Sequence, residues 1–243
     1  MHYNKAFKQG KNPHSMKTLL AFDSDGVLRD ESVSYQRCII ETVAFFDKGM
    51  PASIKELEVS MKQSNDDWER THKILQQRGI KIDFLTVKEK FQDLYLGKNR
   101  DFSGYINDEP WLADNKLLAQ LAEKYLLVII SGAPREEVEY TLKRNGALHH
   151  FSLILGMSDC EGKKDGLEKV MAQFKPQNVF FCDDRPLPIR QAKAVNHVRL
   201  YGILPPQNIN EWAAVLQEAG AEQIFRNVND YCRFVLDCKR NHR

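Results

Sequence analysis

Residues 18–28 read Thr-Leu-Leu-Ala-Phe-Asp-Ser-Asp-Gly-Val-Leu, a short apolar run that leads directly into two aspartates. The run Thr18–Phe22 is continuously apolar, which is typical of a strand buried on both faces of a parallel sheet. Asp23 and Asp25 would therefore lie at the mouth of a low-dielectric core. Crowded carboxylates there need a compensating cation, and oxygen ligands of this kind suit Mg²⁺. The same residues are also typical of a simple turn in which Gly26 supplies a positive φ.

Four further runs rich in Val, Ile, Leu and Phe recur along the chain, and helical patterns follow most of them. These runs are Leu126–Ile130, Ser152–Leu155, Asn178–Cys182 and His197–Tyr201. Helical patterns over Gly166–Phe174 and Ile189–Val195 lie between consecutive runs. Repeated strand–helix units predict an α/β fold, a Rossmann-like doubly wound parallel sheet.

A long insertion separates the first two runs, because roughly a hundred residues without a convincing strand far exceed a minimal crossover of about a dozen. Apolar residues at helical spacing and two capping-box patterns, Ser53-Ile-Lys-Glu56 and Thr86-Val-Lys-Glu89, predict helices there. We therefore expect an α-helical cap domain over residues 31–110, inserted into a core formed by residues 16–30 and 111–243. Residues 1–15 are expected to form a disordered arm.

Polar residues follow three of the predicted strands. Asp183 and Asp184 come directly after Asn178–Cys182, and Ser131-Gly132 follows Leu126–Ile130. Parallel strands bring such ends to one edge of a sheet, so Asp23, Asp25, Asp183 and Asp184 are expected to converge on one cation. Ser131 and the backbone N–H groups near Gly132 would bind an oxyanion. Lys163 and Lys164, before a predicted helix, supply candidate cations.

This series of motifs resembles the haloacid dehalogenase (HAD) superfamily of hydrolases. Asp23–Val27 matches its first motif and Ser131 the second; Lys163, or Lys164 as the alternative, matches the third, and Asp183-Asp184 the fourth. The length of the insertion is similar to the helical cap of the phosphoglycolate-phosphatase-like group. A finer resemblance, to a poorly characterised bacterial subfamily, rests on four short segments. These are Asp25-Gly-Val-Leu28, Ser34-Tyr35, Glu41-Thr42-Val43 and Asn65-Asp66-Asp67-Trp68.

The resemblance and the physical interpretation imply the same chemistry. Asp23 would attack phosphorus and form an aspartyl-phosphate, and Asp25 would act as general acid and then as general base. Ser131 would hydrogen-bond a phosphoryl oxygen, and Lys163 would neutralise charge. The resemblance implies that Asp23, the backbone carbonyl of Asp25, and Asp183 hold Mg²⁺, with Asp184 assisting.

Two further residues are candidates for substrate binding. Trp68 in the predicted cap is positioned to contact substrate, although a tryptophan packed in the cap interior explains the pattern equally well. Arg135, just beyond Ser131, would reach a second anionic group, although an arginine in the first turn of a helix is often solvated.

The expected function is a Mg²⁺-dependent phosphatase acting on a small phosphorylated metabolite. Alternatives on the same scaffold are a phosphomutase, a phosphonatase and a dehalogenase, and Asp25 argues against the dehalogenase because that reaction needs no acid for an alcohol leaving group. From other classes, a phosphoacceptor signalling domain or a non-catalytic binding protein would use similar residues. The motifs name no particular substrate.

Composition excludes other classes of function. The 243 residues carry 35 Lys and Arg against 33 Asp and Glu, a net charge of +2, which argues against a nucleic-acid partner. No apolar run approaches the roughly 20 residues that cross a bilayer, so no membrane partner is expected. The five cysteines include no CxxC pair and are expected to be reduced, which favours a cytoplasmic location. The sequence predicts no oligomeric state.

Overall fold

The computed structural model describes residues 18–64, 66–206 and 209–238. The arm expected over residues 1–15 lies outside these described residues. The chain divides into two compact units, with boundaries between Asp30 and Glu31 and between Pro110 and Trp111. We call residues 31–110 the helical unit and the rest of the described chain the sheet unit.

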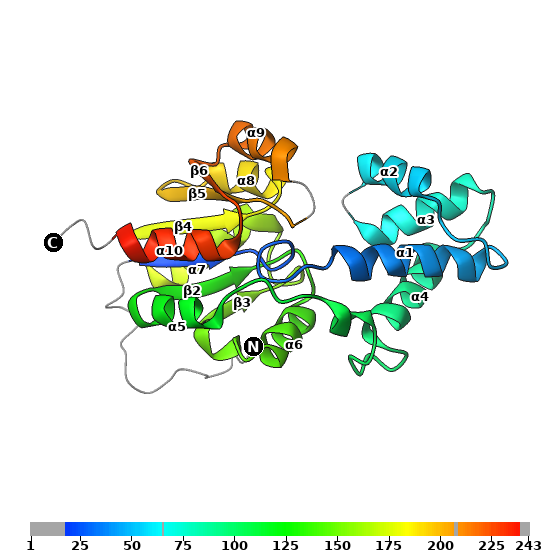
Figure 1. Ribbon diagram of the computed structural model, residues 1–243, viewed down its shortest axis with the longest axis horizontal. Coiled ribbons are helices and arrows are strands. Elements are labelled where there is room, and N and C mark those ends of the chain that lie inside the picture. The colour runs from blue at the N-terminus through cyan, green and yellow to red at the C-terminus, as the bar shows by residue number, and fades with distance from the viewer. Residues whose placement is uncertain (1–17, 65, 207–208, 239–243) are drawn as a thin grey trace. The chain divides into compact units, whose positions relative to one another are not determined.

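The sheet unit contains parallel strands in the order β3-β2-β1-β4-β5-β6 (Figure 1). The strands are β1 (Thr18–Phe22), β2 (Leu126–Ile130), β3 (Leu153–Leu155), β4 (Asn178–Asp183), β5 (Val198–Ile203) and β6 (Gln223–Phe225). The chain runs outward from β1 through β2 to β3 and then returns to the other side of β1 at β4. This order is that of a doubly wound Rossmann-like sheet, so the expected fold class is confirmed.

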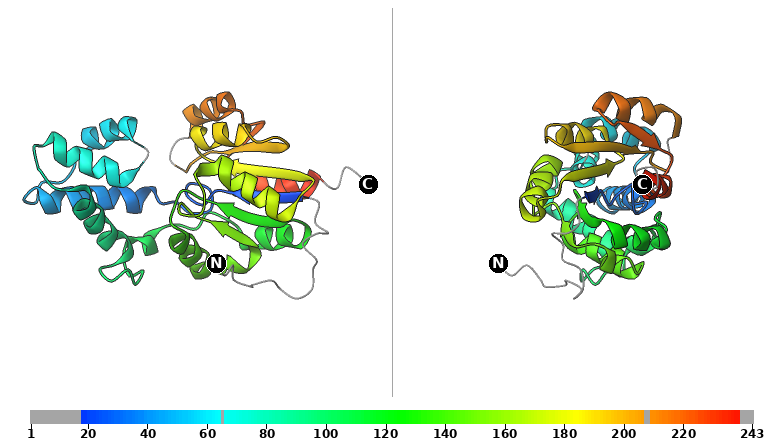
Figure 2. Two further views of the ribbon diagram at one scale, coloured as in Figure 1. Left: turned by 180° about the vertical axis from the view of Figure 1, so that it is seen from behind. Right: turned by 90° about the vertical axis from the view of Figure 1, so that its left-hand side faces the viewer.

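Helices cover both faces of this sheet, as its end-on view shows (Figure 2, right). One face is packed by α5 (Asn115–Lys124), α6 (Arg135–Arg144) and α10 (Val228–Cys238), and the other by α7 (Gly162–Phe174), α8 (Pro186–Lys193) and α9 (Ile209–Ala219). A short 3-10 helix, η3 (Leu148–His150), precedes β3.

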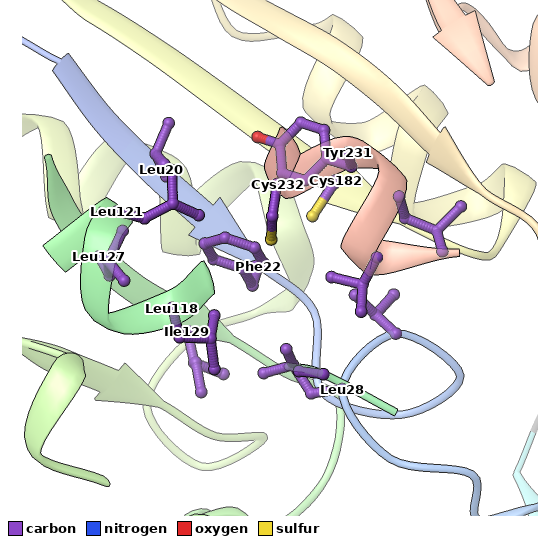
Figure 3. Close-up of a cluster of buried hydrophobic side chains, with 14 of the residues drawn as sticks. Leu20, Phe22, Leu28, Leu118, Leu121, Leu127, Ile129, Cys182, Tyr231 and Cys232 are labelled. Carbon is purple, nitrogen blue, oxygen red and sulfur yellow. The ribbon is translucent and has the colours of Figure 1, made fainter. Parts of the chain in front are cut away.

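The central strand β1 is buried on both sides because successive side chains of a strand point to opposite faces. Leu20 and Phe22 belong to one apolar cluster, and Leu19 and Ala21 belong to the other. In the first cluster the Phe22 ring meets Tyr231 of α10 edge-on, with ring centroids 5.8 Å apart (Figure 3). β1 therefore holds the residues that follow it in a fixed position.

The helical unit consists of α1 (Ser32–Phe46), α2 (Ile54–Gln63), α3 (Asp67–Gln77), α4 (Phe84–Leu96) and the 3-10 helix η2 (Tyr105–Asp108). Helix α1 packs against both α3 and α4. Val43, Ile74, Leu75 and Phe91 from these three helices are at most 1% exposed. The helical unit therefore has an apolar interior of its own.

Two helix starts in this unit test the capping predictions. Ser53 begins α2 with a complete capping box, since its hydroxyl accepts from the Glu56 backbone and Glu56 accepts from the Ser53 backbone, as predicted. The prediction that Thr86 caps a helix is wrong. Asp83 caps α4 instead, and its Oδ1 accepts a hydrogen bond of 2.9 Å from the backbone of Thr86. Because the carboxylate of Asp83 accepts from the backbone N–H of Thr86, Thr86 lies inside the first turn of α4 and not at its start.

The predicted bounds of β1 and β2 match the observed ones, whereas the predicted strands end too early at β4 and β5. β4 extends to Asp183 and β5 to Ile203, whereas β3 and β5 each begin one residue later than predicted, at Leu153 and Val198. Strand β6 was not predicted. In the described part of the chain, no helix is long and apolar enough to cross a membrane. All five cysteines are free thiols, and four of them are buried.

Candidate metal and phosphoryl site

The site lies where the strand order reverses, at the carboxyl ends of β1 and β4. Open α/β sheets bind ligands at such a switch point. Phe22 pairs with Cys182 in register, and the backbone N–H of Asp23 donates to the carbonyl of Cys182 at 3.0 Å. Asp23 and Asp183 therefore leave two hydrogen-bonded strands side by side.

A lysine from α7 joins these carboxylates. Nζ of Lys163 donates to Oδ1 of Asp23 at 2.6 Å and lies 3.3 Å from Oδ2 of Asp183. The same ammonium donates to the carbonyl of Ile130, the last residue of β2. Lys163 thus connects the ends of three neighbouring strands, and its side chain is only 7% exposed.

Two acids of this group have buried oxygens without a hydrogen bond among the described residues. Oδ2 of Asp183 faces Lys163 as an ion pair only, and Oδ1 of Asp184 has no hydrogen-bond partner there. Oδ1 of Asp183 accepts from the backbone of Arg185 at 2.9 Å. The half-exposed side chain of Arg185 also lies 3.4 Å from Oδ2 of Asp184. Buried carboxylate oxygens in this state are costly unless a cation binds them.

Burial and neighbouring charges shift the pKa values of these groups. Burial raises the pKa of Asp183 well above its usual range, and the charge of Asp23 adds to this effect. Burial raises the pKa of Asp184 to about 7, although Arg185 opposes it. Burial alone would lower the pKa of Lys163, but the carboxylates of Asp23 and Asp183 outweigh it, so that this pKa is raised. Lys163 therefore stays charged, but its single positive charge does not balance the three carboxyl groups around it.

The donor set fits a divalent cation. One carboxylate oxygen from each of Asp23, Asp183 and Asp184 lies within 4.8 Å of the other two. Carboxylate oxygens are the ligands that Mg²⁺ prefers, and Mg²⁺ completes its octahedron with water. Three carboxylates beside one buried ammonium leave excess negative charge for such an ion. The side chain of Asp25 is not part of this group.

Gly26 makes room for Asp184. Its φ is +71°, a conformation that favours glycine, and a Cβ at this position would lie 2.2 Å from Oδ2 of Asp184. The loop after β1 can therefore pass directly against the acid that follows β4. Gly26 therefore makes the turn that the sequence predicted, and it also leaves room for the carboxylate of Asp184.

Asp25 points to a different partner. Its Oδ1 accepts a hydrogen bond of 2.7 Å from Nε of Arg29, and its side chain is 23% exposed. Arg29 itself is fully buried. This arginine was not among the predicted site residues, although a basic residue four positions after an acid across a Gly turn was a visible signal.

Ser131 and Gly132 form the loop that follows β2. Ser131 is buried, and its hydroxyl accepts from the backbone of Ala133 at 3.1 Å. A Cβ on Gly132 would meet no atom within 4 Å, so this residue faces open space. Because Lys163 bonds to the carbonyl of Ile130, the loop begins directly beside the carboxylate group.

The structure does not bring two of the predicted residues, Lys164 and Arg135, to the carboxylates. The exposed Lys164 lies 3.8 Å from Glu168 on the same helix, so Lys163 is the lysine at the site. Arg135 forms a double ion pair with Asp159, at 2.8 and 2.6 Å, which occupies its guanidinium. Trp68 belongs to the helical unit, where Nζ of Lys88 lies 3.5 Å from its ring centroid. Its contact with substrate stays a prediction.

A second residue that the sequence did not reveal is Gln191 of α8. Its Oε1 accepts from the backbone N–H of Lys163 at 2.9 Å, at a helix start that has no side-chain cap of its own. Gly162 has a φ of +82°, and a Cβ there would lie 2.8 Å from the same oxygen. Gln191 thus holds the first turn of α7 and with it Lys163. Because this acceptor comes from another helix, no pattern in the sequence around Lys163 predicts it.

The fold and this site define a class of protein, the doubly wound α/β proteins with a cluster of acids at the ends of two adjacent parallel strands. A sequence model of the haloacid dehalogenase-like hydrolase family matches residues 20–200 of the chain. The chain therefore belongs to the haloacid dehalogenase-like hydrolases, and the resemblance seen in its motifs is confirmed.

Solved structures share the fold over most of the chain. A predicted phosphoglycolate phosphatase from Haemophilus somnus is 20% identical, with a TM-score of 0.72 over 93% of this chain and 100% of its own. A protein provisionally named β-phosphoglucomutase from Thermotoga maritima is 18% identical, with a TM-score of 0.69 over 90% and 98%. A phosphatase from Thermococcus thioreducens is 15% identical, with a TM-score of 0.66 over 90% and 99%. At these identities the similarity concerns the fold.

A curated relative is more similar in sequence. An imidazoleglycerol-phosphate dehydratase from Phytophthora nicotianae is 26% identical over 204 residues, which are 77% of this chain and 43% of the relative. The chain thus spans less than half the length of that protein.

Proposed function

We propose that this hydrolase is a Mg²⁺-dependent phosphatase that cleaves a small phosphate monoester through an aspartyl-phosphate on Asp23. One observation carries the proposal. Asp23, Asp183 and Asp184 are buried together at the sheet switch point with Lys163 as their buried counter-charge. An anionic phosphoryl group and a divalent cation are ligands that complement such a site.

In the first step a carboxylate oxygen of Asp23 attacks phosphorus. The bond between phosphorus and the ester oxygen breaks, and its electron pair stays on that oxygen, which takes a proton from the carboxylic acid of Asp25. In the second step Asp25, now a carboxylate, removes a proton from water as the water attacks the aspartyl-phosphate. Phosphate leaves and Asp23 is regenerated.

The other residues hold the phosphoryl group. Lys163 neutralises charge on Asp23 and on the transferring group, and the hydroxyl of Ser131 with the N–H groups near Gly132 binds phosphoryl oxygens. A Mg²⁺ ion held by Asp23, the Asp25 carbonyl, Asp183 and Asp184 would draw charge from the phosphoryl oxygens.

The helical unit would act as the cap that selects the substrate, with Trp68 as a contact. The name of the Phytophthora nicotianae relative refers to a small phosphorylated metabolite, which is in keeping with a substrate of this class. Location in the cytoplasm belongs to the same proposal, since four of the five free thiols are buried and none is paired.

The proposal is tested by phosphate release from p-nitrophenyl phosphate. We expect turnover that requires Mg²⁺, stops with EDTA, and falls at least about 10³-fold in Asp23→Asn. A wild-type rate of phosphate release by the Asp23→Asn protein would show that Asp23 is not the nucleophile. Transfer of the phosphoryl group to an added sugar hydroxyl, in preference to water, would identify a phosphomutase instead.

A further inference from the structure

Arg29 is the largest fully buried side chain in the described part of the molecule, and it carries a charge. A buried guanidinium is destabilising unless anions or acceptors surround it. It lies in the loop after β1, four residues beyond Asp25, and the proposed chemistry has given it no role. Burial of this charge costs stability, which a residue serving packing alone would not need to do.

The contact that distinguishes Arg29 is the one to Asp25. Nε of the guanidinium donates to Oδ1 of the carboxylate at 2.7 Å. The arginine side chain is 0% exposed and that of Asp25 is 23% exposed. Within the described residues, this is the hydrogen bond that the Asp25 carboxylate receives. A buried group thus fixes an acid that itself reaches solvent.

Three further hydrogen bonds hold Arg29, two through its backbone and one through its guanidinium. Its backbone carbonyl accepts from Gly26 at 2.9 Å, and its backbone N–H donates to the carbonyl of Ser24 at 3.2 Å. Its Nη1 lies 3.4 Å from Oγ1 of Thr141 on α6, a weak hydrogen bond. Arg29 therefore links the loop after β1 to a packed helix, and its complete burial leaves its side chain little freedom.

We propose that Arg29 is a positioning residue, which orients the Asp25 carboxyl group for proton transfer to the leaving oxygen of the phosphate ester. The inference rests on the proposed function, in which Asp25 is the general acid. Holding one oxygen of the carboxyl group leaves the other to face the substrate. As the proton moves from Asp25 to the ester oxygen, the carboxylate that remains is matched by the guanidinium charge.

A purely structural role for Arg29 predicts a different pattern of loss. Removal of Arg29 destabilises the protein in either case, because Asp25 and Thr141 lose their partner. A structural defect lowers activity equally for all esters. Loss of an oriented acid harms esters with basic leaving groups most, because only these need the proton as the bond breaks.

Phenyl phosphate and p-nitrophenyl phosphate separate these two cases. The esters are similar in size, but phenolate is the more basic leaving group. We would measure kcat/KM for both with Mg²⁺ in the wild type, Asp25→Asn, Arg29→Lys and Arg29→Gln, together with the melting temperature of each variant. The ratio of the two kcat/KM values reports the proton transfer, since it cancels losses common to both esters.

We expect Arg29→Gln to lower kcat/KM for phenyl phosphate at least about tenfold more than for p-nitrophenyl phosphate, a fraction of the 10²–10⁴-fold that an acid supplies. Arg29→Lys keeps the charge without the planar fork and should shift the ratio less. It also keeps the test open should Arg29→Gln fail to fold. In the Asp25→Asn background, Arg29→Gln should shift the ratio no further, because both changes act on one step.

Arg78→Gln is the matched control. This half-buried arginine bonds Glu56 and Asp47 in the helical unit at 2.7 and 2.6 Å. It should lower the melting temperature and leave the ratio unchanged. Equal losses for both esters in Arg29→Gln and Arg29→Lys would overturn the inference. An unaltered ratio in Asp25→Asn would instead remove Asp25 as the acid, and a wild type inactive on both esters would remove the proposed function and this inference with it.

Discussion

Two adjacent lysines at the start of α7 have opposite surroundings. Lys163 is buried against Asp23 and Asp183, whereas Lys164 is exposed beside Glu168. We expect Lys163→Met to lower kcat/KM for p-nitrophenyl phosphate by about 10²-fold or more, since it removes a preorganised charge from the phosphoryl site. Lys164→Met, the same change one residue away, should stay within about twofold. Similar losses in both variants would show that the helix start matters and the ammonium does not.

The raised pKa of Asp184, about 7, has a consequence for stability. A carboxyl whose pKa is higher in the folded than in the unfolded state binds more protons when folded. Its contribution to the free energy of unfolding therefore falls as pH rises from about 4 to about 7. Without metal, Asp184→Asn should unfold at nearly the wild-type denaturant midpoint at pH 4.5. At pH 8 it should be more stable than wild type by about 1–3 kcal/mol.

Urea unfolding at the two pH values, with and without Mg²⁺, checks this prediction. Saturating Mg²⁺ at pH 8 should stabilise the wild type more than Asp184→Asn and so reduce or reverse the difference. A difference between the two proteins that is independent of pH would show that Asp184 is not the group whose protonation changes.

The individual site residues differ in how far the sequence could predict them. Asp23 and Asp183 directly follow apolar runs, so the rule that parallel strands end at one edge was sufficient. Arg29 and Gln191 were missed for different reasons. The spacing of Asp25 and Arg29 indicated a pair, but the role proposed for Arg29 depends on its complete burial, which the sequence does not reveal. Gln191 acts on a helix distant in sequence.

At the scale of the structural elements, the loop after β1 and the start of α8 depend on one another through Gly26. We expect Gly26→Ala to destabilise the protein by about 1–2 kcal/mol from its positive φ alone, and further because the new Cβ would lie 2.2 Å from Asp184. Displacement of this carboxylate should also raise the Mg²⁺ concentration needed for half-maximal activity.

Gly79→Ala is the control for Gly26→Ala. Gly79 has a similar φ of +76°, but a Cβ there would meet no atom within 4 Å. It should cost about 1 kcal/mol and leave the Mg²⁺ dependence unchanged. Thermal unfolding and Mg²⁺ titration of activity distinguish the two variants. Equal effects on the Mg²⁺ requirement would contradict the proposed contact between Gly26 and a metal-binding acid.

Element boundaries were predictable where local chemistry was decisive. The Ser53 capping box satisfies its own helix start, so sequence alone located it. At α4, both Asp83 and Thr86 are good capping residues, and a choice between them depends on where the chain enters the helix. Strand β6 has three residues, and its first is an exposed glutamine. So short a run has too little pattern of its own to predict a strand, and it forms one because it pairs with β5.

For the whole molecule, the strand order explains why motifs distant in sequence form one site. The chain places β2 and β3 on one side of β1 and β4 on the other, so the acids after β1 and β4 meet at the switch point. Alternating strands and helices predicted the doubly wound class. The pairing of β1 with β4 follows from the motifs only when they are interpreted together as one site.

The two units should respond differently to Mg²⁺. The proposed ligands Asp23, Asp183 and Asp184 all belong to the sheet unit, and the helical unit has its own apolar interior. A ligand stabilises a protein only against openings that break its site. At 100 times its dissociation constant, Mg²⁺ should slow hydrogen exchange of the most protected β1 and β4 amides by up to about 100-fold. Amides of α1–α4 that exchange through opening of the helical unit should be unaffected.

Hydrogen exchange measured by mass spectrometry on peptides from both units tests this expectation. Asp183→Asn is the control, because it removes a ligand and should abolish most of the protection that Mg²⁺ adds to β1 and β4. Equal slowing across α1–α4 would mean that the two units open together as one cooperative structure. Protection confined to β1 and β4 would mean that the helical unit unfolds independently while the metal stays bound to the sheet unit.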